Sequence, residues 1–232
     1  MTLALKKILI TGAAKRIGAA LATHLATDGW HVIIHCNENR LLADKLCKRL
    51  SDSGRKAEVL QADLSNPNAC RKLIRDACEG LELSALINNA SMFVYDKIND
   101  FSLQTLQTHM AVNVAAPAIL TSEFSKNLKS RNNGCVINVL DSKLFGLNPD
   151  YFSYTLSKAA LQNFSILAAQ AYAPKLRVNA IAPGITLPSG GQTEEEFKLS
   201  HQRNLLKKGA DTKDIVAAAR LMLSTPSMTG ET

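Results

Sequence analysis

The sequence predicts a single α/β domain in which a doubly wound parallel sheet of Rossmann type is flanked by helices on both faces. Three observations predict it. Short β-branched runs alternate with longer segments of helical period, a glycine turn follows the first run, and 46% of the 232 residues are apolar. A chain of this length and composition can bury a full core. Crossovers between parallel strands are nearly always right-handed, so the alternation favours a doubly wound arrangement.

Each expected strand is a short apolar run, and a segment with a 3.6-residue period follows it. The expected strands are, in order, KKILIT (6–11), WHVIIH (30–35), KAEVLQ (56–61), LSALIN (83–88), GCVINVL (134–140) and LRVNAIA (176–182). The expected helices are 15–28, 39–53, 67–79, about 102–129 and about 151–173. One further strand is expected after LMLSTPSMTGET (221–232), where the sequence stops, so the final edge strand is apparently missing.

Composition excludes several classes of protein. The opening MTLALKKILITG lacks the apolar core and cleavage site of a secretory signal, and no apolar stretch approaches the roughly 18 residues that span a bilayer. We therefore expect a cytoplasmic protein with no membrane partner. Five cysteines without CxxC spacing suit reduced thiols, and neither they nor the five histidines predict a metal site. The net charge of +7 is scattered, which argues against a nucleic-acid partner.

The segment ILITGAAKRIGAALATHLA runs from strand through glycine turn to helix, with Gly12 and Gly18 at the turn. Glycines let the backbone approach a pyrophosphate closely, while the helix N-terminus directs unpaired N–H groups toward it. Arg16 stands where a middle glycine is usual. An ordinary strand-to-helix turn is the alternative, but the position after the first strand favours a dinucleotide site.

The end of the second strand bears on which dinucleotide binds. An acidic residue usually holds the ribose 2′-hydroxyl there, yet Cys36 occupies that position and Glu38 lies nearby. Lys15, Arg16 and Arg40 are suited to surround a 2′-phosphate. We therefore favour NADPH over NADH. Farther along, Asp63 follows the third strand, where a carboxylate can accept from an adenine amino group.

Tyr154 is the one tyrosine of four with a lysine four residues later, Lys158. That spacing places both side chains on one helix face. A free phenol has a pKa of about 10, and a nearby cation can lower it by about 1 to 3 units. Tyr154 can then act as a general acid for hydride transfer to a double bond. The alternative is that both residues lie on an ordinary solvated helix face. The glycine turn and the strand-end amides of INNAS favour the catalytic interpretation.

These motifs together resemble the short-chain dehydrogenase/reductase family over essentially the whole chain. The residues that carry the resemblance are TGAAKRIG, DLS, NNAS, Asn113 with Val114, Tyr154 with Lys158, and VNAIAPGIT (178–186). The resemblance implies a dinucleotide-binding oxidoreductase domain over 1–232. It implies that Asn113 holds a water in a proton relay with Lys158, and that Lys158 also binds the nicotinamide ribose. It further implies a homo-oligomer, a tetramer assembled through the helices near 102–129 and 151–173.

Residues that match the family positions make up the expected cofactor site. They are Gly12, Lys15, Arg16, Ile17, Gly18, Asn37, Arg40, Asp63, Leu64, Asn89, Ala90, Ser91, Tyr154, Lys158, Pro183, Gly184 and Thr186. The last three border the nicotinamide by resemblance. The expected catalytic residues are Tyr154, Lys158, Asp141 and Asn113.

Several departures from the family pattern resemble one branch, the pteridine reductases. That branch carries TGAAKR with Arg at the middle glycine, an Asp thirteen residues before the Tyr where the family normally has Ser, and an aromatic residue soon after NNAS. Here these are Arg16, Asp141 and Phe93, with Ser91. A pterin presents N–H donors and a C=N bond, which an acidic side chain pairs with better than a hydroxyl does. Together with Tyr154, these four residues form the expected substrate site, and Phe93 would stack on the flat ring.

Alternatives remain open on the sequence alone. The branch carries HYHRS after its second strand, whereas this chain reads HCNEN. Asp141 is equally suited to cap a turn, with Ser142 serving a carbonyl in a carbonyl or 3-oxoacyl thioester reductase. A dinucleotide sensor without turnover is a third reading. Finally, the residues after APGIT, about 186–208, resemble the family's substrate lid, with a capping box formed by Thr193 and Glu196.

Overall fold

The predicted strands form one parallel sheet. The computed structural model describes residues 6–129, 134–188, 192–202 and 204–232. The strands pair in the order β3-β2-β1-β4-β5-β6, so the doubly wound prediction is confirmed. Their bounds are β1 Lys7–Ile10, β2 His31–Cys36, β3 Ala57–Gln61, β4 Leu83–Asn88, β5 Gly134–Val139 and β6 Leu176–Ile181. The order reverses between β1 and β4, and the carboxyl ends of strands at such a point form a crevice for ligands.

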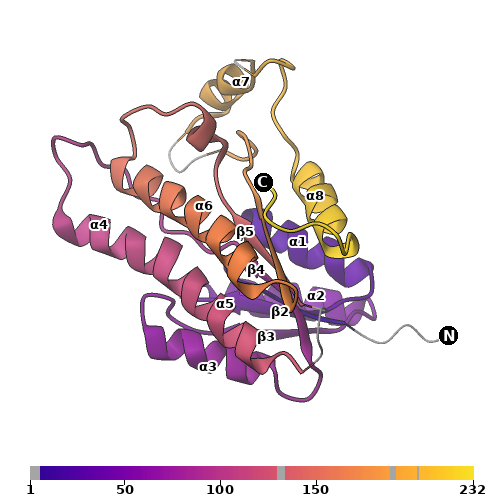
Figure 1. Cartoon of the computed structure of the whole chain (residues 1–232). Helices are drawn as coiled ribbons and strands as arrows, with labels where there is room; N and C mark the ends of the chain where they lie inside the picture. The colour runs from indigo at the N-terminus through magenta and orange to yellow at the C-terminus, as the bar shows by residue number, and fades with distance from the viewer. Residues whose placement is uncertain (1–5, 130–133, 189–191, 203) are drawn as a thin grey trace.

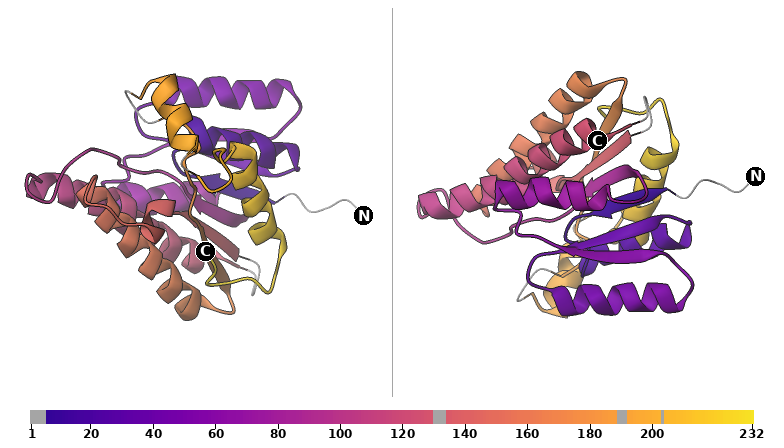
Figure 2. Two further views of the ribbon diagram at one scale, coloured as in Figure 1. Left: turned by 90° about the horizontal axis from the view of Figure 1, so that it is seen from above. Right: turned by 90° about the horizontal axis from the view of Figure 1, so that it is seen from below.

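Helices cover both faces of the sheet (Figures 1 and 2). One core cluster joins the sheet to α1, α2 and α8, and a second joins it to α3, α5 and α6. The helices are α1 Arg16–Thr27, α2 Arg40–Asp52, α3 Pro67–Ala77, α4 Leu103–Met110, α5 Ala116–Asn127, α6 Phe152–Tyr172, α7 Glu194–Gln202 and α8 Thr212–Ser224. Six of them, α1 to α6, lie within the five predicted helical ranges, α7 follows the predicted capping box, and α8 was not predicted.

The single helix predicted for 102–129 is interrupted by a π-helical turn, Ala111–Ala115, between α4 and α5. Pro117 has no N–H and cannot donate to the carbonyl of Asn113, its α-helical acceptor four residues earlier. The Ala116 N–H reaches the carbonyl of Ala111, five residues back. The helix therefore widens where Asn113 lies. Such π-helical turns are frequently found at functional sites.

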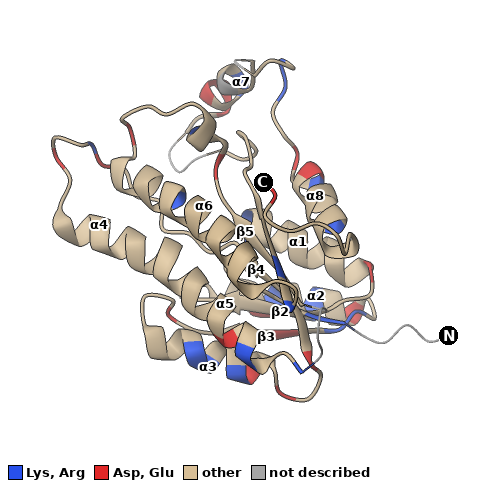
Figure 3. Ribbon diagram, in the orientation of Figure 1, with Lys and Arg blue, Asp and Glu red and all other residues tan. Residues whose placement is uncertain are grey.

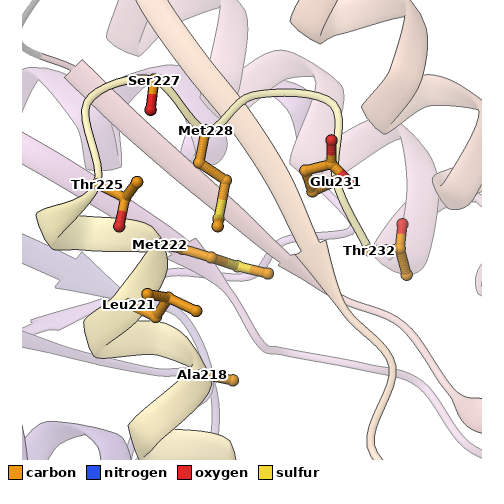
Figure 4. A pocket seen from close by; sticks show the side chains of 8 residues that line it. All are labelled: Ala218, Leu221, Met222, Thr225, Ser227, Met228, Glu231 and Thr232. Carbon is orange, nitrogen blue, oxygen red and sulfur yellow. The ribbon is translucent and has the colours of Figure 1, made fainter.

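The chain after α8 runs back along the outer edge of β6. The N–H of Gly230 donates to the carbonyl of Val178, and the N–H of Ala180 donates to that of Glu231, both at 2.8 Å. Within the described residues this segment forms no assigned strand, and the extra edge strand stays a prediction. A hollow of about 430 Å³ lies between α8 and this segment, and Leu221 and Met228 are among its lining residues (Figure 4).

Charged residues are distributed over the surface of several helices, with Lys and Arg interspersed with Asp and Glu (Figure 3). None of the helices in the described part of the chain is long and apolar enough to cross a membrane. The described residues also contain no group of three or more His, Cys, Asp or Glu side chains placed to hold a metal ion.

Candidate active site

The glycine turn between β1 and α1 is packed so closely that side chains are excluded. Gly12 has a φ of +63°, and a Cβ there would lie 2.9 Å from the Cα of Ala90. A Cβ on Gly18 would lie 2.4 Å from the carbonyl oxygen of Gly12. Arg16, at the position where a glycine is usual, does adopt the left-handed region with a φ of +56°. The backbone of this turn therefore has the shape that the sequence predicts, although one of its residues is not glycine.

The N-terminus of α1 is open to a ligand. Its N-cap residue, Lys15, makes no side-chain capping hydrogen bond, and no acidic residue lies in the first turn. Unpaired N–H groups and the positive end of the helix dipole therefore face the crevice. Lys15 and Arg16 are exposed beside it. This combination suits the phosphates of a dinucleotide.

The end of β4 is tied to the same turn. The Thr11 hydroxyl oxygen accepts from the N–H of Asn89 at 2.9 Å and from the N–H of Ala90 at 3.0 Å. The Asn89 amide donates to the carbonyls of Thr11 and Gly12, at 2.8 and 3.2 Å. Asn89 thus holds the turn through its side chain, whereas the sequence predicted that it contacts the cofactor. Thr11 was missed, although a hydroxyl directly before the glycine turn was visible in the sequence.

The residues predicted to select the dinucleotide are partly engaged with the protein. The Arg40 Nε pairs with Asp44 one helical turn away, at 2.9 Å. The carbonyl of Asn37 accepts from Gln61, and both carboxylate oxygens of Asp63 accept from Ser65 at 2.8 Å. These contacts order the loops after β2 and β3. The part that these residues play toward a dinucleotide stays a prediction.

The two catalytic candidates from different elements meet directly. The Tyr154 hydroxyl, in the first turn of α6, donates to Asp141 Oδ2 at 2.7 Å just beyond β5. The other Asp141 oxygen accepts from the N–H of Lys143 and caps the short 3-10 helix Ser142–Phe145. Asp141 is therefore both a cap and a partner of Tyr154. Ser142 is exposed; its N–H donates to the carbonyl of Pro183, and its hydroxyl lies near Gly184.

Lys158 lies behind Tyr154 rather than beside its hydroxyl. Its ammonium donates to the carbonyl of Val139 at 2.7 Å and lies 5.6 Å from the centre of the Tyr154 ring. Burial lowers the pKa of Lys158 to about 8, against a smaller opposing effect of Asp141. Because folding lowers this pKa, the buried ammonium destabilises the folded state below pH 8, and this penalty is relieved as the pH rises from about 8 toward 10.5.

The expectation that Lys158 lowers the pKa of Tyr154 is wrong for this structure. The pKa of Tyr154 is raised, first by burial and then by the charge of Asp141 and the hydrogen bond to it. A phenolate here would face a carboxylate in a site where the tyrosine is only 6% exposed. The phenol therefore keeps its proton unless Asp141 is neutral or a ligand changes the balance.

A short segment, residues 91–96, crosses in front of the catalytic pair, and we call it the strap. Side chains behind it hold every second residue. Asn113 accepts from the N–H of Met92 at 2.7 Å and donates to its carbonyl at 3.0 Å, and His109 Nε2 accepts from the N–H of Val94 at 3.3 Å. The remaining Asn113 donor bonds Ser157. The side chain of Asn113 therefore anchors the strap, and its predicted water relay stays a prediction. His109 was missed.

The strap presents Phe93 to the site. Its ring stacks on Tyr151 at 4.4 Å between centroids and meets Tyr154 edge-on at 4.6 Å. Phe93 is 45% exposed, so it is not a core residue. Ser91, also exposed, lies two residues before Phe93 in the strap, and its hydroxyl donates to Asn113 Oδ1 at 3.3 Å. The predicted substrate residues Phe93 and Tyr154 are thus brought together.

Asp96, at the end of the strap, supplies the cap that α6 lacks. Tyr151, the N-cap residue of α6, makes no side-chain capping bond and has a φ of +54°. Asp96 Oδ1 accepts from the N–H of Ser153 at 3.0 Å, and its carbonyl accepts from the N–H of Phe152 at 3.2 Å. Asp96 therefore joins the strap to the helix that carries Tyr154. Nothing in the local sequence around Asp96 pointed to this contact.

The segment after β6 returns to the glycine turn. Arg16 donates to the carbonyl of Pro188 at 2.8 Å, and Thr186 donates to the carbonyl of Gly184 at 2.8 Å. The predicted capping box at the start of α7 is confirmed: the N–H of Thr193 donates to Glu196, and the N–H of Glu196 donates to Thr193 Oγ1. Residues 189–191 and 203 of the predicted lid lie outside the described residues.

Comparison with known proteins identifies the family. A model of the short chain dehydrogenase family matches residues 6–198. The chain belongs to this family. A relative in Methylorubrum extorquens, an uncharacterised oxidoreductase, is 32% identical over 190 residues, which cover 81% of this chain and 76% of the relative.

Two further proteins narrow the resemblance of this short-chain dehydrogenase. A dihydromonapterin reductase of Shigella boydii is 26% identical, covering 96% of this chain and 92% of its own length. The crystal structure of FolM alternative dihydrofolate reductase 1 from Brucella suis, in complex with NADP, has a TM-score of 0.94 and 38% identity, covering 100% of this chain and 93% of that one. The predicted resemblance to the pteridine reductases is confirmed.

Replacement of Gly18 by Ala tests the packing of the turn. The added methyl meets the carbonyl of Gly12 and the amide of Asn89, so we expect α1 to shift and the free energy of unfolding to fall by about 1 to 3 kcal/mol. Chemical denaturation measures the change. Gly146→Ala is the control, because nothing lies within 4 Å of its added Cβ. Equal stability of the two variants would contradict the packing described here.

Replacement of Asp141 by Asn tests the electrostatics. Asp141 raises the pKa of both Tyr154 and Lys158, so we expect both pKa values to fall, that of Lys158 to below about 8. NMR titration of labelled tyrosine and lysine measures them. Asp150→Asn is the control, since Asp150 contributes to the pKa of Lys143 rather than to these two. Unchanged values in Asp141→Asn would mean that burial alone sets both.

Replacement of Asp96 by Ala tests the cap on α6. Loss of the acceptor for the Ser153 N–H should lower the free energy of unfolding by about 1 to 3 kcal/mol and loosen the first turn of α6. Hydrogen exchange of residues 152–155 measures the loosening. Asp96→Asn, which keeps an oxygen acceptor, should retain most of the protection. Equal exchange in the two variants would show that the contact does not order the helix.

Proposed function

We propose that this protein is an NADPH-dependent reductase of a pteridine or dihydrofolate-like ring. The observation that carries the proposal is the 2.7 Å hydrogen bond between the Tyr154 hydroxyl and the Asp141 carboxylate. It places an acidic group, rather than a hydroxyl, next to the tyrosine of a short-chain dehydrogenase. The similarity to dihydromonapterin and dihydrofolate reductases supports the same assignment.

The residues of this chain fit the coenzyme. The turn at Gly12 and Gly18 leaves no room for side chains, and the uncapped start of α1 offers N–H groups to phosphates. Lys15 and Arg16 supply positive charge for a 2′-phosphate, and the crystallised Brucella relatives hold NADP. NADPH, when bound, supplies a hydride. Lys158 would hold the nicotinamide ribose, and Pro183, Gly184 and Thr186 would border the nicotinamide.

Asp141 has two chemical roles to offer. As a carboxylate it accepts from the N–H groups of a pterin, and as an acid it donates. The raised pKa of Tyr154 disfavours a phenolate facing a carboxylate. We therefore assign proton delivery to the pair: Asp141 takes up a proton from solvent, Tyr154 gives its own proton to a ring nitrogen, and the proton on Asp141 passes to the tyrosine through their hydrogen bond. The tyrosine ends neutral and the aspartate ends ionised, so no phenolate persists.

The strap and the segment after β6 would enclose the substrate. Phe93, stacked on Tyr151 and edge-on to Tyr154, offers an exposed aromatic surface to a flat ring. Residues 186–208 are proposed as the lid, because the contact of Arg16 with Pro188 ties their base to the coenzyme turn. A cytoplasmic location remains an expectation from composition, and a tetramer remains one from the family resemblance.

The deciding experiment compares substrates. We expect the wild-type protein to oxidise NADPH with dihydrobiopterin and dihydrofolate and to leave an acetoacetyl thioester unreduced. Asp141→Ser should lower pterin turnover by about 100-fold or more, because a general acid contributes that much. The loss of NADPH absorbance measures the rates.

Ser142→Ala is the matched control. It should leave pterin turnover unchanged, since the Tyr154 hydroxyl donates to Asp141 and not to Ser142. Thioester reduction that survives Asp141→Ser and is lost in Ser142→Ala would establish a carbonyl reductase instead. Tight NADPH binding without turnover of any of the three compounds would establish a sensor.

A further inference from the structure

His35 is buried at the end of β2, and both nitrogens of its ring have partners. Nδ1 accepts from the N–H of Gly12 at 3.1 Å, and Nε2 lies 3.1 Å from the carbonyl of Ala62. An N–H donor on Nδ1 means that the proton is on Nε2, which donates to Ala62. The side chain is only 1% exposed, and burial lowers its pKa to about 4. The ring is therefore neutral, in one fixed tautomer.

The backbone of His35 reinforces the same contact. Its carbonyl accepts from the N–H of Ala13 at 2.9 Å. The N–H groups of Gly12 and Ala13, which are successive residues of the glycine turn, thus both donate to His35 in β2. On the opposite side the turn packs against Ala90, where a Cβ on Gly12 would have no room. His35 and Ala90 together fix how far the turn lies from the sheet.

The other end of the imidazole fixes the loop after β3. Ala62 directly precedes Asp63, and the N–H of Ala62 donates to the carbonyl of Cys36 at 3.1 Å. The ring therefore connects the turn that faces the phosphates with the loop that was predicted to face the adenine. These two segments lie about 50 residues apart in the sequence, and the ring of His35 joins them by side-chain hydrogen bonds.

We propose that His35 is a positioning residue for the dinucleotide, which it orders without touching. This inference rests on the proposed function. Because the Gly12 N–H is used by His35, phosphate is left to the N–H groups that follow it at the start of α1. The imidazole acts through the turn: it holds Gly12 in its left-handed conformation at the distance from the sheet that the coenzyme requires.

Two variants separate the two hydrogen bonds of the ring. In His35→Asn the side-chain oxygen takes the place of Nδ1 and can accept from Gly12, but the side chain is too short to reach Ala62. In His35→Gln the amide takes the place of Nε2 and can donate to Ala62, while the Gly12 N–H is left buried without an acceptor. Both variants remove the buried imidazole ring. An effect that comes from lost packing alone should therefore be the same in the two variants.

We expect His35→Gln to raise the Kd of NADPH, measured by fluorescence titration, by about tenfold or more, and His35→Asn to raise it by about threefold at most. Turnover at saturating NADPH should stay near wild type in both, because Tyr154, Lys158 and Asp141 lie on other elements. Hydrogen exchange of residues 12–14 in the protein without coenzyme should accelerate in His35→Gln and much less in His35→Asn.

Equal changes of Kd and exchange in the two variants would overturn the inference and leave His35 as ordinary core packing. A fall in turnover at saturating NADPH that matches the rise in Kd would overturn it as well. If the wild-type protein does not bind NADPH, the proposed function is overturned, and the exchange of residues 12–14 then decides whether His35 anchors the turn.

Discussion

The hydrogen bond from Tyr154 to Asp141 is the constraint on which the rest of the site depends. It requires the first turn of α6 to meet the loop after β5, two segments joined by the 3-10 helix Ser142–Phe145 and the residues that follow it. Lys158 strengthens the same junction, since its ammonium ends on the carbonyl of Val139, the last residue of β5. Asp96 caps α6 from the strap, which Asn113 and His109 hold in turn. Each contact limits the movement of the tyrosine hydroxyl.

Burial makes this junction electrostatically demanding. An ammonium and a carboxylate lie on either side of a phenol in a site shielded from water, and the pKa of Lys158 falls while that of Tyr154 rises. Burial disfavours the charged form of each group, and this moves the pKa of an acid and that of a base in opposite directions. A serine in place of Asp141 would leave the phenol without a charged neighbour at its hydroxyl. The aspartate therefore changes the protonation chemistry of the tyrosine as well as the groups that can bind beside it.

Local patterns predicted the sheet, most helices, the glycine turn and the pairing of Tyr154 with Lys158, because each depends on residues close together in the chain. The roles of His35, His109 and Asp96 depend on contacts between separate segments, for which a single sequence carries no periodic signal. The direction of the Tyr154 pKa was missed for the same reason: spacing places Lys158 near the ring, but only the fold shows that its charge is directed at Val139. The π-helical turn was not predicted, although Pro117 marks a place where α-helical hydrogen bonding is interrupted.

Arg16 shows how strain and function are joined in this site. A non-glycine residue at a φ of +56° is disfavoured relative to glycine, so the position by itself would be better served by glycine. The guanidinium offsets that cost through its hydrogen bond to the carbonyl of Pro188, at the base of the proposed lid. Arg16 therefore ties the glycine turn before α1 to the segment that follows β6.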